Sequence, residues 1–350
     1  MTDAEAGRMR DFLGYGRQPP DPRWPNGAHV AVNFVINYEE GGEYSVPEGD
    51  KASEAALTEG ATAAVAGRDL AAESMFMYGS RAGFWRLHRM FTRRNLPCTV
   101  FAVARALERN GEAAAAMREA GWDVAGHGLR WEMHANLGPE TEREHIRLAT
   151  EIITRCMGSR PEGWYTRYAP SLSTRTILLD AGYSYDSDAY DDELPYWVKV
   201  ASRDQLVIPY SLVHNDVRFS RQGITTGNDY FDYIKNAVQC VIDEDPRFGL
   251  HNRIIAHPGR AYGLAKALDW LANHPKVWIV RRVDIAAHWR KWHPPPRAAG
   301  HTVLQGRSSQ SVPNGEGEYL DFSSSPSANQ NPLVPRRAYR HAARSRQGRR

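Results

Sequence analysis

The sequence contains too little cysteine to depend on disulfides. Only Cys98, Cys156 and Cys240 occur among 350 residues, an odd number without C-x-x-C spacing. This count excludes a disulfide framework and a cysteine zinc cage, and it favours three small, buried side chains. A chain of this length buries about three quarters of its unfolded surface, so it needs neither device to fold.

Long hydrophobic runs are also missing. No apolar stretch approaches the roughly 18 residues that a membrane span requires. Residues 1–10 carry four charged side chains and no apolar segment of the kind found in secretory signals. We therefore expect a cytoplasmic protein without a membrane partner.

A net positive charge is missing outside the C-terminal end. The net charge is +3, but residues 294–350 contain nine Arg, no Lys and three carboxylates, which leaves a net charge of −3 on the rest. The body therefore offers no reason to expect nucleic acid binding. Residues 296–350 are rich in Ser, Pro, Gly, Gln and Arg, and this composition predicts a disordered basic tail. Its Arg-rich end is either a solvated extension or a contact for nucleic acid or anionic lipid.

The remaining residues alternate apolar runs with amphipathic segments. One clear helix begins at Pro139, where the missing N–H is tolerated, and ends before Gly158, a residue suited to a left-handed cap. Strands separated by helices predict a parallel α/β fold, either a barrel or a doubly wound sheet. We expect an N-terminal segment over 1–20, this domain over 21–295 and the tail over 296–350. The predicted strands are residues 29–38, 98–103, 122–125, 206–210, 253–256 and 277–280.

Polar side chains cluster where these strands end, which is where sites form in parallel α/β folds. Each alone is more typical of a solvated loop, a structural histidine or a turn cap. Their regular succession indicates one site, and a long insertion at about 41–72 is expected to cover a site or an interface. The candidates are Glu39, Glu40, His127, Arg167, Asp186, Asp188, His251 and His257.

Several stretches together are more specific than any single residue. They are NFVINYEEGGE (33–43), GHGLRW (126–131), GWYTR (163–167), YDSDAYDDELPYW (185–197), VIPYSLVHNDVRF (207–219), GLHNRI (249–254), HPGR (257–260) and VWIVRRVDIAAHW (277–289). Their order resembles the polysaccharide deacetylase superfamily, and most closely its cofactor-independent allantoinase branch. The resemblance covers nearly all of residues 20–292 and implies a distorted (β/α) barrel. The tail has no counterpart in it.

One departure from the superfamily pattern concerns the metal. Glu39 and Glu40 stand where the pattern has an Asp-Asp pair, and Trp131 stands four residues after His127, where the second metal-binding His belongs. A catalytic zinc normally has three protein ligands. His134 completes a set only if this segment is a loop, because seven helical residues rise about 10 Å. The resemblance therefore implies no cofactor, with zinc bound by Glu40, His127 and His134 as the alternative.

The resemblance also implies roles for the other residues. Amide hydrolysis needs an activated water, a stabilised oxyanion and a proton for the leaving nitrogen. Glu39 matches the general base beside Glu40, and His251 matches the acid. His127 would orient water or polarise the carbonyl. Arg167 is a fixed cation suited to a ureido oxygen or to developing negative charge.

Further residues are expected around the substrate. Asp186 and Asp188 would orient His or Arg side chains. Trp131 and Trp164 are either flat walls for a planar ring or ordinary core residues. His257 stands where the allantoinase branch commonly has Arg, so we expect substrate contacts to differ from that branch.

The leading hypothesis is a hydrolase of non-peptide C–N bonds in purine catabolism that opens (S)-allantoin to allantoate, or opens a related cyclic ureide or imide. The first alternative is a zinc-dependent N-deacetylase of acetamido sugars in carbohydrate metabolism. The second is a non-catalytic barrel that binds a ligand, with the basic tail contacting an anionic partner. The expected partners are a small cyclic amide and further copies of the chain, because the resembled branch is oligomeric.

Overall fold

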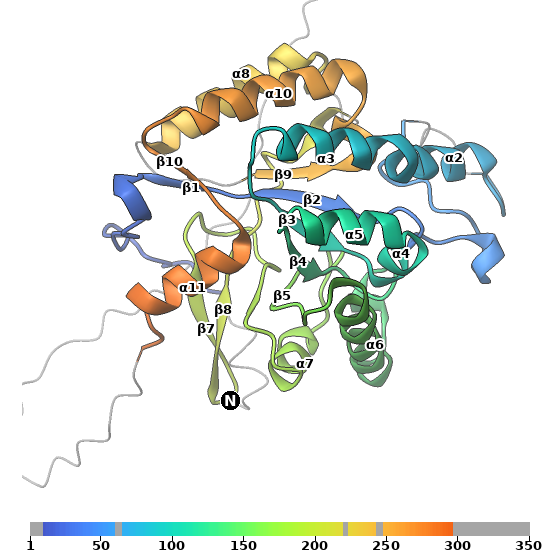
Figure 1. Ribbon diagram of the computed structural model, residues 1–350. Helices are drawn as coiled ribbons and strands as arrows, with labels where there is room; N and C mark the ends of the chain where they lie inside the picture. Colours follow the sequence, from blue (N-terminus) through green and yellow to red (C-terminus); the bar gives the residue numbers. More distant parts are fainter. Residues whose placement is uncertain (1–9, 60–64, 220–222, 243–247, 297–350) are drawn as a thin grey trace, which may run out of the picture. The chain divides into compact units, whose positions relative to one another are not determined.

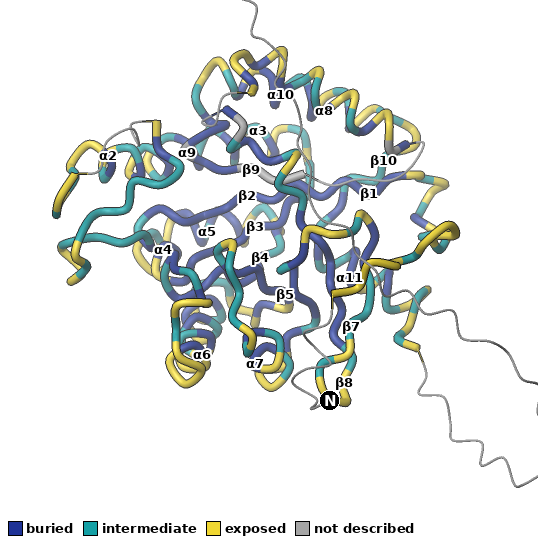
Figure 2. The backbone as a smooth tube through the Cα atoms, turned by 180° about the vertical axis from the view of Figure 1, so that it is seen from behind, coloured by how far each residue is buried: buried dark blue, intermediate teal, exposed yellow. Residues whose placement is uncertain are grey.

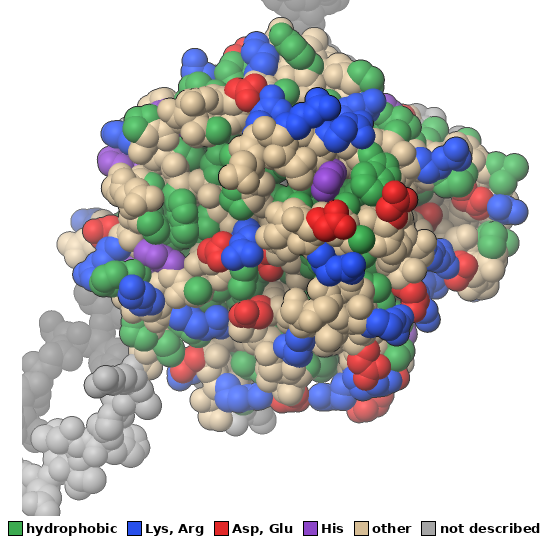
Figure 3. All heavy atoms as spheres, in the orientation of Figure 1, with side chains coloured by type: hydrophobic (Ala, Val, Ile, Leu, Met, Phe, Trp, Pro, Cys, Tyr) green, Lys and Arg blue, Asp and Glu red, His purple; other side chains and the backbone are tan. Residues whose placement is uncertain are grey.

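The computed structural model describes residues 10–59, 65–219, 223–242 and 248–296. The predicted tail over 296–350 lies outside this description except for Pro296, and so does the start of the N-terminal segment. No helix in the described part of the chain combines the length and apolar character that crossing a membrane requires. On the face shown in Figure 3, basic and acidic side chains lie among one another.

The described strands form two groups (Figure 1). The larger sheet has the order β7-β8-β6-β5-β4-β3-β2-β9, and β1 pairs separately with β10. Neighbours are parallel except for the β7–β8 hairpin. The strands are β1 (Val30–Val32), β2 (Phe34–Tyr38), β3 (Thr99–Ala102), β4 (Asp123–Gly126), β5 (Gly163–Trp164), β6 (Tyr185–Asp186), β7 (Tyr196–Val200), β8 (Arg203–Val207), β9 (Phe248–His251) and β10 (Val277–Ile279).

Helices connect most of the parallel strands and flank the sheet. They are α2 (Leu70–Tyr78), α3 (Phe84–Thr92), α4 (Ala104–Arg109), α5 (Gly111–Glu119), α6 (Pro139–Met157), α7 (Thr174–Asp180), α8 (Gly227–Ile242), α9 (Asn252–Ile255), α10 (Pro258–Ala272) and α11 (Arg282–Trp292). A π-helical turn, η3 (Gly79–Gly83), joins α2 to α3, and two 3-10 turns near the site are η4 (His134–Asn136) and η5 (Asp216–Phe219).

The strands enclose an apolar interior, and the helices cover the outside (Figure 2). Strand β2 contacts both regions because alternate side chains point to opposite faces. Its Phe34 and Ile36 belong to the cluster shared with the helices, whereas Val35 packs inside with Phe101 and Tyr165. Burial on both faces explains why this strand is an unbroken apolar run in the sequence.

The barrel is distorted, as the resemblance implied, because the first strand breaks at Asn33 and the described strands do not close into a hydrogen-bonded ring. The gap is bridged by Arg282, which is fully buried at the start of α11. Its guanidinium donates to Asn33 Oδ1 at 3.1 Å, Ser187 Oγ at 2.8 Å and the Ile208 carbonyl at 3.0 Å. Burial lowers the pKa of Arg282, and these neutral acceptors compensate its lost hydration.

The structure confirms the predicted helix α6, whose C-cap Gly158 is left-handed with φ at 75°. The predicted strand at 253–256 is wrong, since these residues lie in and just after the short helix α9. The strand is instead β9, which ends at His251 opposite Asn37 of β2. A short apolar run does not distinguish a buried strand from a helical turn, which explains the error.

A half-buried carboxyl at the start of β4 leads to a prediction about stability. Asp123 Oδ2 accepts hydrogen bonds from Thr99 Oγ1 and from the backbone N–H of Val283 in α11. Burial raises the pKa of Asp123 from 3.8 to about 6. Its protonated form therefore stabilises the fold below pH 4, and this contribution is lost as the pH rises through 6.

We expect wild-type protein to lose about 1–2 kcal/mol relative to Asp123→Asn between pH 4 and pH 7, an amplitude reduced by the partial exposure of the side chain. Urea unfolding of both proteins at several pH values measures this difference. A difference that is constant or increases with pH would contradict the assignment.

Candidate active site

The carboxyl ends of three strands bring three predicted residues together. Glu39 follows β2, His127 follows β4, and His251 ends β9. Glu39 Oε1 lies 3.2 Å from His127 Nε2 and 3.7 Å from His251 Nε2. All three residues are at most 6% exposed. A buried carboxylate between two imidazoles is suited to moving protons.

The backbone determines which nitrogen of His127 carries a proton. Nδ1 lies 2.7 Å from the carbonyl oxygen of Tyr165. Because a carbonyl can only accept, Nδ1 is the donor, and in a neutral ring Nε2 would be the acceptor. Nε2 and the Glu39 carboxylate would then both be acceptors. Their 3.2 Å contact therefore requires one further proton, which the two groups share.

The sequence analysis missed the partner of His251. His251 Nδ1 lies 2.8 Å from Asp216 Oδ1, and Asp216 Oδ2 accepts the backbone N–H groups of His251 at 2.7 Å and Ile255 at 3.1 Å. Asp216 is fully buried at the start of η5. It thus holds both the imidazole and the first turn of α9. Asp216 lies in one of the stretches that carry the resemblance, but no spacing rule links it to a residue 35 positions later.

Glu40 points away from this group, because successive side chains at a strand end face opposite sides. Its carboxylate lies against Gly79 in η3, where a Cβ atom would overlap it. Glu40 Oε2 also lies 3.4 Å from Asn252 Nδ2 and 3.3 Å from the backbone nitrogen of Glu39. Glu40 therefore supports the turn that carries Glu39, and the two glutamates do not converge on one reacting atom.

Aromatic rings form the floor below the histidines. The His127 ring stacks on Tyr165 with centroids 5.1 Å apart and planes at 7°. Tyr165 in turn contacts Phe101 and Tyr210, each at 4.8 Å. Burial raises the pKa values of the Tyr165 and Tyr210 hydroxyls, so both stay neutral. Such an apolar floor strengthens the electrostatic interactions above it.

Trp131 and Arg167 form a wall on the loops after β4 and β5. The guanidinium carbon of Arg167 lies 3.6 Å from the centre of the Trp131 ring, and Nη1 donates to the Trp131 carbonyl at 2.6 Å. Nη2 pairs with Glu54 Oε2 at 2.6 Å. Glu54 belongs to the insertion after β2, and the sequence analysis had not singled it out. The predicted cation is therefore present, but it is already paired.

The structure does not bring Trp164 to the site. Trp164 is fully buried, its Nε1 donates to Thr166 Oγ1 at 3.1 Å, and its ring lies against Gly126 and Tyr183. Of the two interpretations of this residue, the structure supports core packing. The reason is its place inside the two-residue strand β5, whose side chains alternate between the barrel interior and the helices.

Asp186 contacts an Arg side chain, as predicted, whereas the carboxylate of Asp188 binds Thr166 and not a His or Arg side chain. Asp186 pairs with Arg175 at 3.2 Å. Asp188 accepts hydrogen bonds from the backbone N–H of Thr166 at 2.7 Å and from its hydroxyl at 2.8 Å. Burial, with the neighbouring Asp186 carboxylate, raises the pKa of Asp188. Asp188 thus fixes Thr166, the residue between Tyr165 and Arg167.

The alternative zinc ligands do not converge. His134 is fully buried in η4, where Nδ1 bonds Glu142 at 2.9 Å, and Glu142 also accepts the Ser171 hydroxyl. These hydrogen bonds outweigh burial and lower the pKa of Glu142. His134 thus belongs to a separate polar cluster, and Glu40 faces η3. Among the described residues, no three His, Cys, Asp or Glu side chains are grouped to bind a metal ion.

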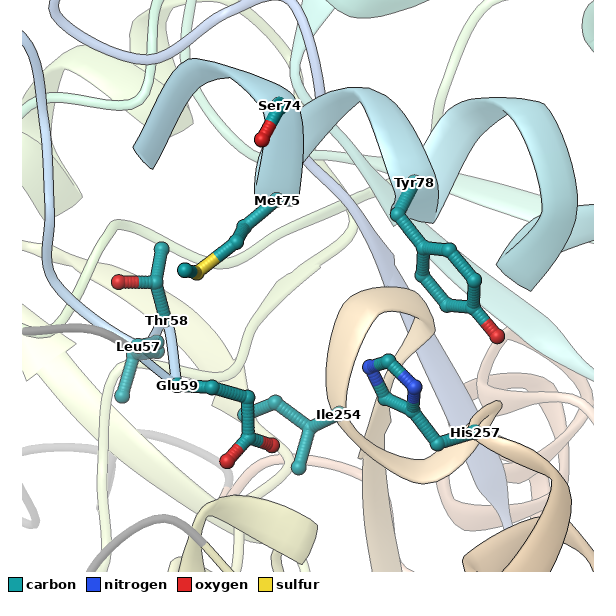
Figure 4. Close-up of a pocket in the computed structure, with 8 residues that line it drawn as sticks. All are labelled: Leu57, Thr58, Glu59, Ser74, Met75, Tyr78, Ile254 and His257. Carbon is teal, nitrogen blue, oxygen red and sulfur yellow. The ribbon is translucent and has the colours of Figure 1, made fainter. Parts of the chain in front are cut away.

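His257 lies apart from the three residues, beyond α9. Its ring stacks on Tyr78 with centroids 4.4 Å apart. Together with Leu57, Met75 and Ile254 it lines a cavity of about 290 Å³ (Figure 4). In the figure Tyr78 and His257 stand on one side, Leu57 and Met75 on the other, and Ile254 between them. Its predicted contact with the substrate of Glu39 is therefore not supported by this placement.

Comparisons with known proteins show which family this chain resembles. Residues 70–185 match the polysaccharide deacetylase family. A Schizosaccharomyces pombe protein assigned to the polysaccharide deacetylases is 36% identical over 81% of this chain and 98% of its own length. A Pseudomonas aeruginosa PAO1 crystal structure assigned to the same class is 44% identical, with a TM-score of 0.78, over 81% of this chain and 99% of that one. The crystal structure of PuuE allantoinase is 42% identical, with a TM-score of 0.79, over 82% and 99%.

Proposed function

We propose that this chain, which belongs to the polysaccharide deacetylase family, hydrolyses a cyclic ureide. Membership of this family indicates a hydrolase that acts on carbon–nitrogen bonds. The reaction we propose is the opening of (S)-allantoin to allantoate or the equivalent ring opening of a relative. The observation that carries the proposal is the Glu39 carboxylate, placed 3.2 Å from one imidazole and 3.7 Å from another. The 42% identity with an allantoinase supports the same substrate class.

The groups that can accept and donate protons at this site match those that ring hydrolysis requires. Glu39 takes a proton from the attacking water, whose oxygen bonds to the ring carbonyl carbon. His127 Nε2–H donates to the developing oxyanion. His251 Nε2–H protonates the ring nitrogen as the C–N bond breaks. The proton on Glu39 then returns to His251 across their 3.7 Å contact, and the residues are reset.

Asp216 supports the acid role of His251. When His251 carries two protons, its Nδ1–H donates to the Asp216 carboxylate, which stabilises the imidazolium and directs Nε2 toward Glu39. Trp131, at 3% exposure, packs against the Arg167 guanidinium and holds it in place. An acetamido sugar deacetylase that depends on zinc is less well supported, because Glu40, His127 and His134 do not form a donor set.

Purified wild-type protein tests this proposal directly. After dialysis against a strong chelator, the protein is expected to retain its rate on allantoin or hydantoin, since these residues move every proton themselves. The zinc content is measured on the same sample by elemental analysis. Activity that appears only on N-acetylated sugars, or that returns only with stoichiometric zinc, would contradict it. The expected homo-oligomer and cytoplasmic location stay predictions.

A further inference from the structure

We propose that Glu54 makes this site selective for uncharged cyclic ureides by neutralising Arg167. The inference rests on the proposed function and adds the charge of the substrate to it. Glu54 acts through Arg167, so it is a positioning residue.

The Glu54–Arg167 pair belongs to the wall formed with Trp131, on the loop that follows Tyr165, whose carbonyl lies 2.7 Å from His127 Nδ1. The two side chains are 12% and 13% exposed, and their Oε2–Nη2 distance is 2.6 Å. Arg167 is fixed from two further sides, by the Trp131 ring at 3.6 Å and by the Trp131 carbonyl at 2.6 Å. A guanidinium held in this way cannot turn to follow a ligand, so its partner determines what charge the wall presents.

Glu54 is itself fixed by its own loop. Its Oε1 accepts the backbone N–H of Ala56 at 2.9 Å, and its backbone N–H donates to the Tyr44 carbonyl at 2.8 Å. The Tyr44 ring lies 5.8 Å from the Arg167 guanidinium. One carboxylate oxygen therefore accepts a hydrogen bond from the loop backbone, and the other pairs with Arg167.

This arrangement discriminates by charge. An Arg without a carboxylate partner binds ligand carboxylates in a bidentate manner. In this site a ligand carboxylate would have to displace Glu54, which would leave a second negative charge in a largely buried wall. A neutral carbonyl needs only one remaining N–H of Arg167 and displaces nothing. The pair thus favours a ureide without an acidic substituent.

A second ion pair provides a matched control. Asp50, also in the insertion, pairs with Arg130 on the loop after β4. Asp50→Asn removes one carboxylate from the same insertion, as Glu54→Gln does, but leaves Arg167 paired. General changes of charge or loop order affect both variants, whereas a change that acts through Arg167 affects Glu54→Gln alone.

The experiment measures binding of two ligands by calorimetry: hydantoin, and hydantoin-5-acetate, which is the same ring with a carboxylate. Glu54→Gln is expected to bind hydantoin-5-acetate roughly tenfold more tightly than wild type and hydantoin within about threefold. Glu54→Asp, which keeps the charge, is expected to retain the wild-type preference. Adding Arg167→Met to Glu54→Gln is expected to remove the gain.

Two outcomes would overturn the inference: equal weakening of both ligands in Glu54→Gln, which marks a merely structural role, or the same gain in Asp50→Asn. Hydrolysis of neutral ureides by wild type is scored separately. If wild type opens them and Glu54→Gln gains nothing, this inference alone fails. If wild type opens none while the carboxylate gain is observed, the proposed function fails and the role of Glu54 stands.

Discussion

Replacing Glu39 with Gln is expected to lower kcat/KM for the cyclic ureide by roughly 10²–10⁴-fold, the usual contribution of a general base. The amide keeps the shape of the side chain but cannot take a proton from water. It also removes the shared proton between Glu39 and His127, whose contact is 3.2 Å in the wild type. Because the pocket keeps its form, most of the loss should be in kcat, with KM changing little.

Glu40→Gln is the matched comparison for this variant. It changes the adjacent glutamate in the same way, but that carboxylate faces Gly79 and Asn252. Steady-state kinetics of both variants, with thermal unfolding to verify folding, should show a far larger loss for Glu39→Gln. The reverse order would assign the base to Glu40 and contradict the mechanism.

Asp216→Asn is expected to reduce kcat by roughly 10²–10⁴-fold, a range similar to that expected for Glu39→Gln. In the wild type Oδ2 accepts two backbone N–H groups and Oδ1 faces His251 Nδ1. The amide oxygen of Asn must take the Oδ2 position, since an NH₂ group would meet two donors there. The NH₂ group then faces Nδ1 and forces it to accept. His251 would keep a proton on Nε2 as a neutral ring, which is a poor acid.

The pH profile distinguishes this effect from damage to the fold. Without the carboxylate the imidazolium of His251 is less stable, so the alkaline limb of the kcat/KM profile should move to lower pH. Thermal unfolding of the same variant reports whether α9 still begins normally. If the variant keeps a near-normal kcat and an unchanged pH profile, Asp216 only supports the Ile255 backbone and has no part in the acid role of His251.

Residues that directly follow a strand could be predicted, because parallel strands end at one edge of the sheet. This rule identified Glu39 and His127, whereas the role of His251 came from the resemblance, because the predicted strand stood at 253–256; the structure brings all three together. It could not identify Asp216 or Glu54. Both lie in loops whose paths depend on tertiary packing, and both meet their partners far along the sequence.

Three candidate residues lie away from Glu39 for a common reason. Trp164 and His134 are of the expected residue types and lie close to the motifs, but both side chains are fully buried in other clusters. His257 follows α9 and stacks on Tyr78 instead. A short stretch of sequence shows that a residue is near a strand end, but not which way its side chain points. That direction depends on one-residue shifts in strand and helix boundaries.

The buried Arg282 limits how far this protein can be shortened from its C-terminal side. Its guanidinium joins Asn33 to Ser187 and to the Ile208 carbonyl, and among the described residues no strand pairing links the Asn33 segment to β6 or β8. A version ending before α11 would leave these groups facing an empty slot. The smallest independently folding unit must therefore include α11, even though every residue assigned to the chemistry lies upstream of it.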